Sequence, residues 1–394
     1  MHDELIKSPL FNLSMASKEL FHSNMLYWIS VKYPQPFLKI LNYLGIDTSS
    51  WEGKKWVVYR EKNHFDLSVY AKNGNKEECL LIVENKVKGI PQMYQLEKYL
   101  TKKTDKTQLL LLSLCTEFCQ KSDIQEKWKI ASYSDLSSAI RCVLLQIYNP
   151  YHHALLEDYC LYIDYLHRTQ KNWTIKLEDY YVKTFVNSDT EITKLDDVRK
   201  KVLISQMADV LYSRYTQAKF ATNKEIEKAC QEDEPGQVYI NTGMSHTTAI
   251  LDVKIRITGN LVYVIQLQGD QFRHCIEVLG KNDIEGIAVI KTLKSYLKGL
   301  NGKDVVDNIN KLESLILNGN YLTTVQRQGG RYGFNETEIA LPKSRNEFCQ
   351  FGDAFVYQYV LIKDDVTIDK IINVILTTIT DLQSNIIEQN KNRH

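Results

Sequence analysis

An apolar run, residues 79–83, leads directly into the tripeptide Glu84-Asn85-Lys86. A short apolar run of this kind predicts a buried β-strand. Side chains alternate along a strand, so Glu84 and Lys86 share one face of the sheet and Asn85 lies on the other. Charged side chains seldom end a buried strand unless they are paired or bind a metal. The end of this strand is therefore the first candidate for a functional site.

A second carboxylate, Asp66, belongs to the preceding predicted strand. The connection contains Asn73-Gly74, a dipeptide typical of a tight hairpin. A two-residue turn at this dipeptide would place Asp66 opposite Leu81. A loop of about five residues would instead place Asp66 directly opposite Glu84. Both registers leave the two carboxylates near one edge of the sheet, and the second is better suited to sharing a cation.

Composition limits the class of protein without defining its chemistry. The chain has 394 residues, of which 44% are hydrophobic, and a net charge of +1, so one large or two medium domains are expected. No apolar run is long enough to span a bilayer, and the first residues do not form a signal peptide. The eight cysteines include no CxxC pair, which favours free thiols in a reducing compartment. These features predict a soluble cytoplasmic protein that does not associate with membranes.

The first 150 residues predict an α/β sandwich, a mixed sheet flanked by helices. Helices are expected from Ser14 or Ser17 to Lys32, over residues 36–45, after Pro91, and after a cap at Ser134-Asp135. The predicted strands are residues 56–61, 64–70, 79–86, 107–113 and 129–133.

A polar stretch, residues 167–172, is the predicted domain boundary, which divides the chain into residues 1–170 and 171–394. The second part is expected to be an α+β domain. Its predicted helices are residues 177–186, 195–220, 305–317 and 367–389, and its predicted strands are residues 247–257, 261–268, 337–341 and 354–363.

Two carboxylates on neighbouring strands can hold a hard divalent cation through oxygen. Such a cation is a Lewis acid and lowers the pKa of a bound water, which becomes a nucleophile. Lys86 shares a face with Glu84 and can screen the charge that develops on a phosphate during hydrolysis. The pattern therefore suits phosphodiester hydrolysis, although D-x17-E-x-K alone occurs by chance in many chains of this size.

Four motifs together are far more specific than this pattern. They are Glu19-Leu20-Phe21-His22-Ser23-Asn24, Arg60-Glu61…Phe65-Asp66, Ile82-Val83-Glu84-Asn85-Lys86 and Gln95-Leu96-Glu97-Lys98-Tyr99. In content and order they resemble the PD-(D/E)xK nuclease superfamily, in particular its bacterial subgroup with a Glu-x-x-His-Ser helix and a Q-x-x-x-Y motif. The resemblance covers about residues 10–145. The proline of the family name is absent, because Phe65 precedes Asp66.

The resemblance implies a restriction-endonuclease-like core and a metal-dependent nuclease. Asp66 and Glu84 would bind Mg²⁺, for which Mn²⁺ can substitute, and Lys86 would be the catalytic lysine. Glu19 corresponds to a first-helix glutamate that adds a carboxylate to the metal site. Mg²⁺-activated water would then hydrolyse a phosphodiester bond of nucleic acid, expected to be DNA.

Other matching residues have supporting roles. Gln95 and Tyr99 correspond to residues that lie against the substrate backbone, and both can donate hydrogen bonds to phosphate. Without the resemblance they equally fit an ordinary half-exposed helix face. His22, Ser23 and Glu61 are candidates for contacts behind the metal ligands. A buried, hydrogen-bonded position is favoured for His22, and a salt bridge to Lys86 is one option for Glu61.

Two alternatives to a nuclease remain open at this point. One is a catalytically weak nucleic-acid-binding protein on the same fold, and the other is a protein-interaction module in a defence or mobile-element system. Lysines near the Gln95 helix (Lys88, Lys98, Lys102, Lys103 and Lys106) could follow a phosphate backbone or form an ordinary solvated surface. Residues 171–394 could recognise DNA, form a homodimer interface or bind another protein.

Overall fold

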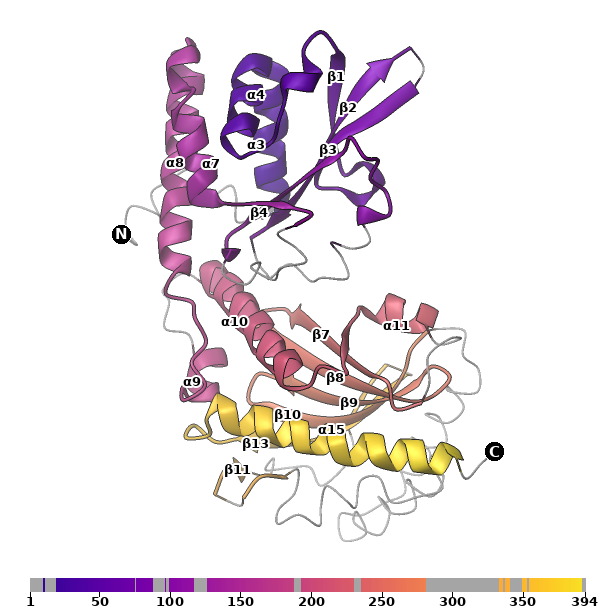
Figure 1. Ribbon diagram of the computed structural model, residues 1–394. Coiled ribbons are helices and arrows are strands. Elements are labelled where there is room, and N and C mark those ends of the chain that lie inside the picture. Colours follow the sequence, from indigo (N-terminus) through magenta and orange to yellow (C-terminus); the bar gives the residue numbers. More distant parts are fainter. Residues whose placement is uncertain are drawn as a thin grey trace. The chain divides into compact units, whose positions relative to one another are not determined.

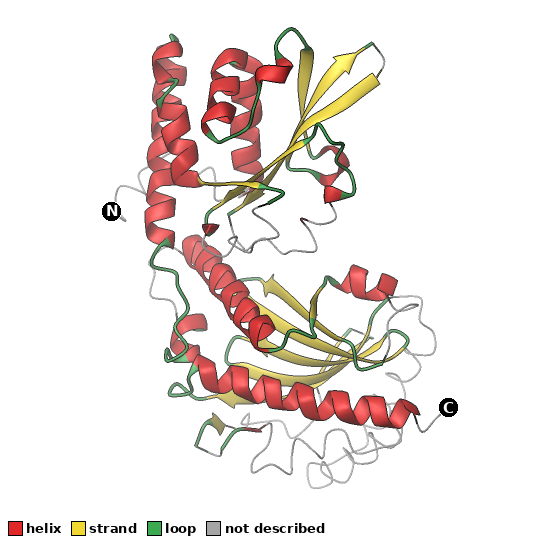
Figure 2. Cartoon of the chain, viewed as in Figure 1, coloured by secondary structure: helices red, strands yellow, loops and turns green. Residues whose placement is uncertain are grey.

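The computed structural model describes residues 10, 19–74, 76–87, 96, 99–116, 126–187, 193–229, 235–280, 333–335, 337–340, 349–352 and 354–391. The chain divides into two compact units, Met1–Thr174 and Ile175–His394. Each unit contains one mixed sheet, and the described residues form eight α-helices (Figures 1 and 2). The protein is therefore a mixed α/β protein with two mixed sheets.

The sheet of the first unit has five strands in sequence order. They are β1 (Lys55–Arg60), β2 (Leu67–Asn73), β3 (Lys76–Lys86), β4 (Gln108–Ser113) and β5 (Lys129–Ser132). The first three strands form an antiparallel meander, whereas β3, β4 and β5 are parallel. Strands β3 and β4 are buried along most of their length, as expected for strands covered on two faces.

A β-bulge sets the register between β2 and β3. Asn73 pairs with Lys76, so only two residues separate the strands, and neither the predicted turn at Asn73-Gly74 nor the five-residue loop is found. The register shifts at Leu80, the extra residue of the bulge, and the ladder ends with Leu67 opposite Val83. Continuing this register by one residue brings Asp66 opposite Glu84. The ladder ends before Asp66, so the expected pairing itself is not formed, and a bulge, not a longer loop, sets the register that leads toward it.

The described helices of the first unit are α3 (Glu19–Lys32), α4 (Pro34–Tyr43), α7 (Tyr133–Arg141) and α8 (Pro150–Gln170). Helix α4 starts with a proline and ends before Gly45, whose φ of 84° suits a glycine at a helix C-terminus. Helix α7 is capped by Ser132, which forms a reciprocal capping box with Asp135. Of the predicted cap Ser134-Asp135, Asp135 takes part in this capping box, whereas Ser134 lies inside the helix and is not the cap.

The second unit is built on an eight-stranded sheet. Its main strands are β7 (Val238–Ser245), β8 (Thr248–Thr258), β9 (Leu261–Gln268), β10 (Gln271–Val278) and β13 (Phe355–Ile362), joined by antiparallel pairing. Short strands complete it: β6 (Lys219–Phe220), β11 (Ile339–Ala340) and β12 (Cys349–Phe351). The parallel pairing of β6 with β7 makes the sheet mixed.

Helices α10 (Thr193–Arg214) and α15 (Ile368–Lys391) lie across one face of this sheet, as Figure 1 shows. Two shorter helices, α9 (Tyr181–Phe185) and α11 (Asn223–Ala229), complete the described part of the unit. The predicted helix over residues 305–317 lies outside the described residues. Within the described part of the chain, no helix combines the length and apolar character needed to cross a membrane.

Candidate functional site

Glu84 and Lys86 lie at the C-terminal end of β3. The Lys86 Nζ atom lies 2.8 Å from Glu84 Oε1, and the two side chains are 16% and 2% exposed. Burial of a carboxylate at this level is unfavourable unless a cation or hydrogen-bond donor compensates it. The two charged residues at the end of this buried strand are therefore paired with each other, as is expected from the sequence for such residues unless they bind a metal.

Asp66 immediately precedes β2 and is half-buried. Its Oδ2 atom accepts a hydrogen bond of 2.6 Å from the backbone N–H of Asn85. This bond holds the Asp66 carboxyl group beside the residue that follows Glu84. A carboxylate has about four lone-pair sites on its two oxygens. One hydrogen bond on Oδ2 is therefore compatible with coordination of a cation.

Asn85 lies on the opposite face of β3, as alternation requires. Its Nδ2 atom donates a hydrogen bond of 2.7 Å to Oγ of Ser23 on α3, and both side chains are fully buried. Ser23, a predicted supporting residue, therefore attaches the first described helix to the strand that carries Glu84 and Lys86. Glu19 begins the same helix one turn earlier, but its side chain lies outside the described residues.

His22 is completely buried between aromatic rings. Its Nδ1 atom is 2.9 Å from the Tyr159 hydroxyl, its ring stacks on Tyr162 and it packs edge-on against Tyr133. Burial lowers the pKa of His22 to about 3, because the charged imidazolium would lose its hydration. His22 is therefore a neutral residue of the core, the position favoured from the sequence.

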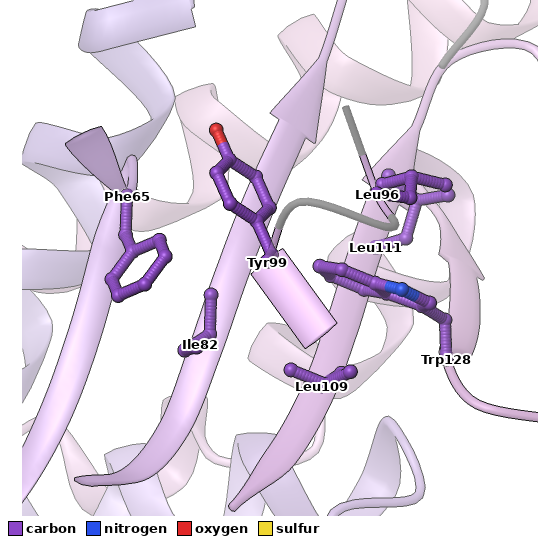
Figure 3. Packing of buried hydrophobic residues seen from close by; sticks show 7 residues of the cluster. All are labelled: Phe65, Ile82, Leu96, Tyr99, Leu109, Leu111 and Trp128. Carbon is purple, nitrogen blue, oxygen red and sulfur yellow. The ribbon is translucent and has the colours of Figure 1, made fainter. Parts of the chain in front are cut away.

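Tyr99 packs into the opposite side of the sheet from Ser23. Figure 3 shows its ring between Phe65 on one side and Leu111 and Trp128 on the other. The side chain is buried, and its hydroxyl donates a hydrogen bond of 3.1 Å to the carbonyl of His64. The hydroxyl expected to contact a phosphate is thus directed at the chain's own backbone. Gln95 lies outside the described residues.

The turn before Asp66 has an unusual backbone that the sequence does not signal. Glu61, Asn63 and His64 have φ angles of 54°, 59° and 68°, in the left-handed region that non-glycine residues rarely adopt. Asn63 and His64 belong to the residue types that are enriched there, but Glu61 does not. One predicted role of Glu61 is a salt bridge to Lys86. The side chain of Glu61 is exposed, and Lys86 pairs with Glu84.

The donor set at this edge of the sheet fits a hard cation. Mg²⁺ prefers oxygen ligands, retains several waters and is commonly bound by one or two protein carboxylates together with substrate phosphates. Asp66, directly before β2, and Glu84, in the neighbouring strand β3, supply two such carboxylates. Among the described residues, no cluster of three or more His, Cys, Asp or Glu side chains could hold a metal. A third protein carboxylate would have to come from a side chain outside them, as is predicted for Glu19.

Three lysines of the predicted basic cluster fall within the described residues. Lys102 donates a hydrogen bond of 3.0 Å to the carbonyl of Asn63. Lys106 forms a salt bridge with Glu78, in which Nζ lies 3.0 Å from Oε1. Lys103 is exposed. Part of the cluster is therefore engaged with the protein, and Lys88 and Lys98 lie outside the described residues.

The chain was also compared with known proteins. No protein-family model, no curated protein and no solved structure matches it. The case for a function therefore rests on the arrangement of Asp66, Glu84 and Lys86 and of the residues around them.

Proposed function

We propose that this protein is a metal-dependent nuclease that hydrolyses DNA phosphodiester bonds with a Mg²⁺-activated water. The observation that carries the proposal is the convergence at one edge of the first sheet. The Asp66 carboxyl group accepts a hydrogen bond from the backbone N–H of Asn85, the residue after Glu84, and the Lys86 ammonium lies 2.8 Å from Glu84. Two residues of β3 and one that directly precedes β2 thereby form the carboxylate, carboxylate and lysine combination that phosphodiester hydrolysis can use.

The topology of the first unit supports the same proposal. Two helices (α3 and α4), an antiparallel three-stranded meander, helical residues at Leu96, Tyr99 and Leu100, and a strand parallel to β3 follow one another. This is the order expected for a restriction-endonuclease-like core, with the site residues at the ends of β2 and β3. We propose that residues 1–170 form this catalytic core and that residues 171–394 serve substrate recognition or oligomerisation.

The site residues have distinct roles in this proposal. Asp66 and Glu84 would hold the cation, and Glu19 would add a third carboxylate. When bound, Mg²⁺ supplies Lewis acidity and lowers the pKa of a coordinated water. Lys86, held in place by Glu84, would stabilise negative charge on the phosphate oxygens in the transition state. The hydrogen bond from Asn85 would keep the Asp66 carboxyl group oriented toward the cation.

The proposal is tested by incubating the full chain with double-stranded DNA, single-stranded DNA and RNA in the presence of Mg²⁺ or Mn²⁺. Glu84→Ala and Lys86→Ala should each reduce cleavage about a hundredfold or more. Glu78→Ala and Lys76→Ala are matched controls at the other, exposed end of β3 and should retain activity.

Full activity in Glu84→Ala or Lys86→Ala would overturn the assignment. Metal-independent binding of DNA without cleavage by the wild-type chain would favour the catalytically weak binding protein instead. The choice among the three nucleic acids would define the substrate class.

A further inference from the structure

Two side chains from another segment donate hydrogen bonds to the turn that precedes Asp66. The Tyr99 hydroxyl donates a hydrogen bond of 3.1 Å to the carbonyl of His64, and Lys102 Nζ donates one of 3.0 Å to the carbonyl of Asn63. The two donors are three residues apart, and the backbone N–H of Lys102 bonds to the carbonyl of Tyr99. They therefore project from one turn of chain onto two successive carbonyls.

The same two side chains also hold Phe65, the residue between the turn and Asp66. The ring centroids of Phe65 and Tyr99 are 5.1 Å apart in an edge-on arrangement, and Lys102 Nζ lies 5.3 Å from the centroid of the Phe65 ring. Phe65 is 2% exposed, and Figure 3 shows it beside Tyr99 at the edge of the hydrophobic cluster. Two carbonyls and one ring immediately upstream of Asp66 are thus restrained together.

Such restraint is needed because of the conformation of the turn. Left-handed backbone at three non-glycine residues is unfavourable and persists only where surrounding contacts impose it. Without those contacts the turn would relax to more common angles. The displacement would pass through Phe65 to Asp66, whose carboxyl group is otherwise aligned by the Asn85 N–H bond.

We infer that Tyr99 and Lys102 are positioning residues that hold the turn at residues 61–64 and thereby place the Asp66 carboxylate for metal binding. This inference rests on the proposed function, and it assigns Tyr99 a role other than contact with the substrate backbone. Groups that orient metal ligands commonly change metal affinity by about 10–100-fold when removed.

The test uses Tyr99→Phe and Lys102→Met in the full chain. Tyr33→Phe and Lys39→Met are matched controls, because they remove hydrogen bonds of 2.6 Å and 3.0 Å elsewhere in the same unit. Mn²⁺ binding is measured by electron paramagnetic resonance without DNA. Tyr99→Phe and Lys102→Met should each weaken Mn²⁺ binding about tenfold, while the controls should bind Mn²⁺ as the wild type does.

Three further measurements separate positioning from other roles. Hydrogen exchange of the Asn85 amide should accelerate in Tyr99→Phe and Lys102→Met, because that N–H bonds to Asp66, and the thermal unfolding midpoint reports any general loss of stability. In DNA cleavage, the Mg²⁺ concentration for half-maximal rate should rise while the KM for DNA stays unchanged.

Each alternative has a recognisable outcome. A raised KM for DNA with unchanged Mn²⁺ affinity would assign Tyr99 to substrate contact and overturn the inference. Unchanged Mn²⁺ affinity and amide exchange in both variants would also overturn it, while the nuclease proposal would stand if Glu84→Ala abolished Mn²⁺ binding. Failure of the wild-type chain to bind Mn²⁺ would overturn both proposals.

Discussion

The backbone N–H of Asn85 donates a hydrogen bond of 2.6 Å to Oδ2 of Asp66. The same residue uses its side-chain amide to bind Ser23 on α3. Asn85 therefore joins the candidate site on one side of β3 to the first described helix on the other. From the sequence alone it fills only the variable position between Glu84 and Lys86.

The bond between Ser23 and Asn85 should contribute measurably to stability. Ser23→Ala leaves a buried amide group without its acceptor, so the free energy of unfolding should fall by about 1–3 kcal/mol. Ser30→Ala is the matched control on α3, because Ser30 is also buried but bonds to the carbonyl of Tyr27 in its own helix. Urea unfolding measures both variants. Equal stability of the two would show that the bond to Asn85 contributes little.

His22 should make the first unit sensitive to acid. Its pKa is lowered from 6.5 to about 3 by burial, so between these values the unfolded chain takes up a proton that the folded chain does not. The free energy of unfolding should consequently fall by about 1.4 kcal/mol for each pH unit below 6.5. His22→Gln lacks this proton uptake and should show a shallower decline. Urea unfolding at pH 7.5, 6.0 and 5.0 compares the two, and parallel declines would contradict the prediction.

Lys254 should stabilise the second unit most strongly at neutral pH. It is 1% exposed and forms an ion pair with Glu277. Burial raises the pKa of both Glu277 and Asp252, and the charge of Lys254 offsets part of that rise. Lys254→Met leaves these carboxylates without that cation, so we expect a loss of about 3–5 kcal/mol at pH 7.5.

The loss from Lys254→Met should shrink as the pH is lowered to 5. The variant raises the folded-state pKa of both carboxyl groups, so the folded chain takes up protons before the unfolded chain does. Lys224→Met, at an exposed position of α11, is the control and should change stability little at either pH. Thermal unfolding followed by circular dichroism measures both variants. A loss for Lys254→Met that does not depend on pH would contradict this account.

Local patterns predict several elements closely. Strand β9 has the predicted bounds, and α4, β4 and α15 lie within a few residues of theirs, because apolar periodicity and helix-end residues report directly on local structure. Strand β10 is missed. Its sequence carries Arg273, which contacts Gln266 on the adjacent strand β9, and Glu277, which contacts Lys254 on β8, one strand further away. Those partners lie outside the segment, so the segment read alone does not show how its charges are accommodated.

The sequence by itself determined that Glu84 and Lys86 share a face of a buried strand with Asn85 on the opposite face. Side-chain alternation is a property of the extended backbone and needs no tertiary information. Only the tertiary structure decided that a bulge at Leu80 sets the register of β2 and β3, that Asp66 bonds to the N–H of Asn85, and that the Tyr99 hydroxyl bonds to the carbonyl of His64. Register and hydrogen-bond partners depend on how separate segments pack, because a shift of one residue exchanges the two faces of a strand.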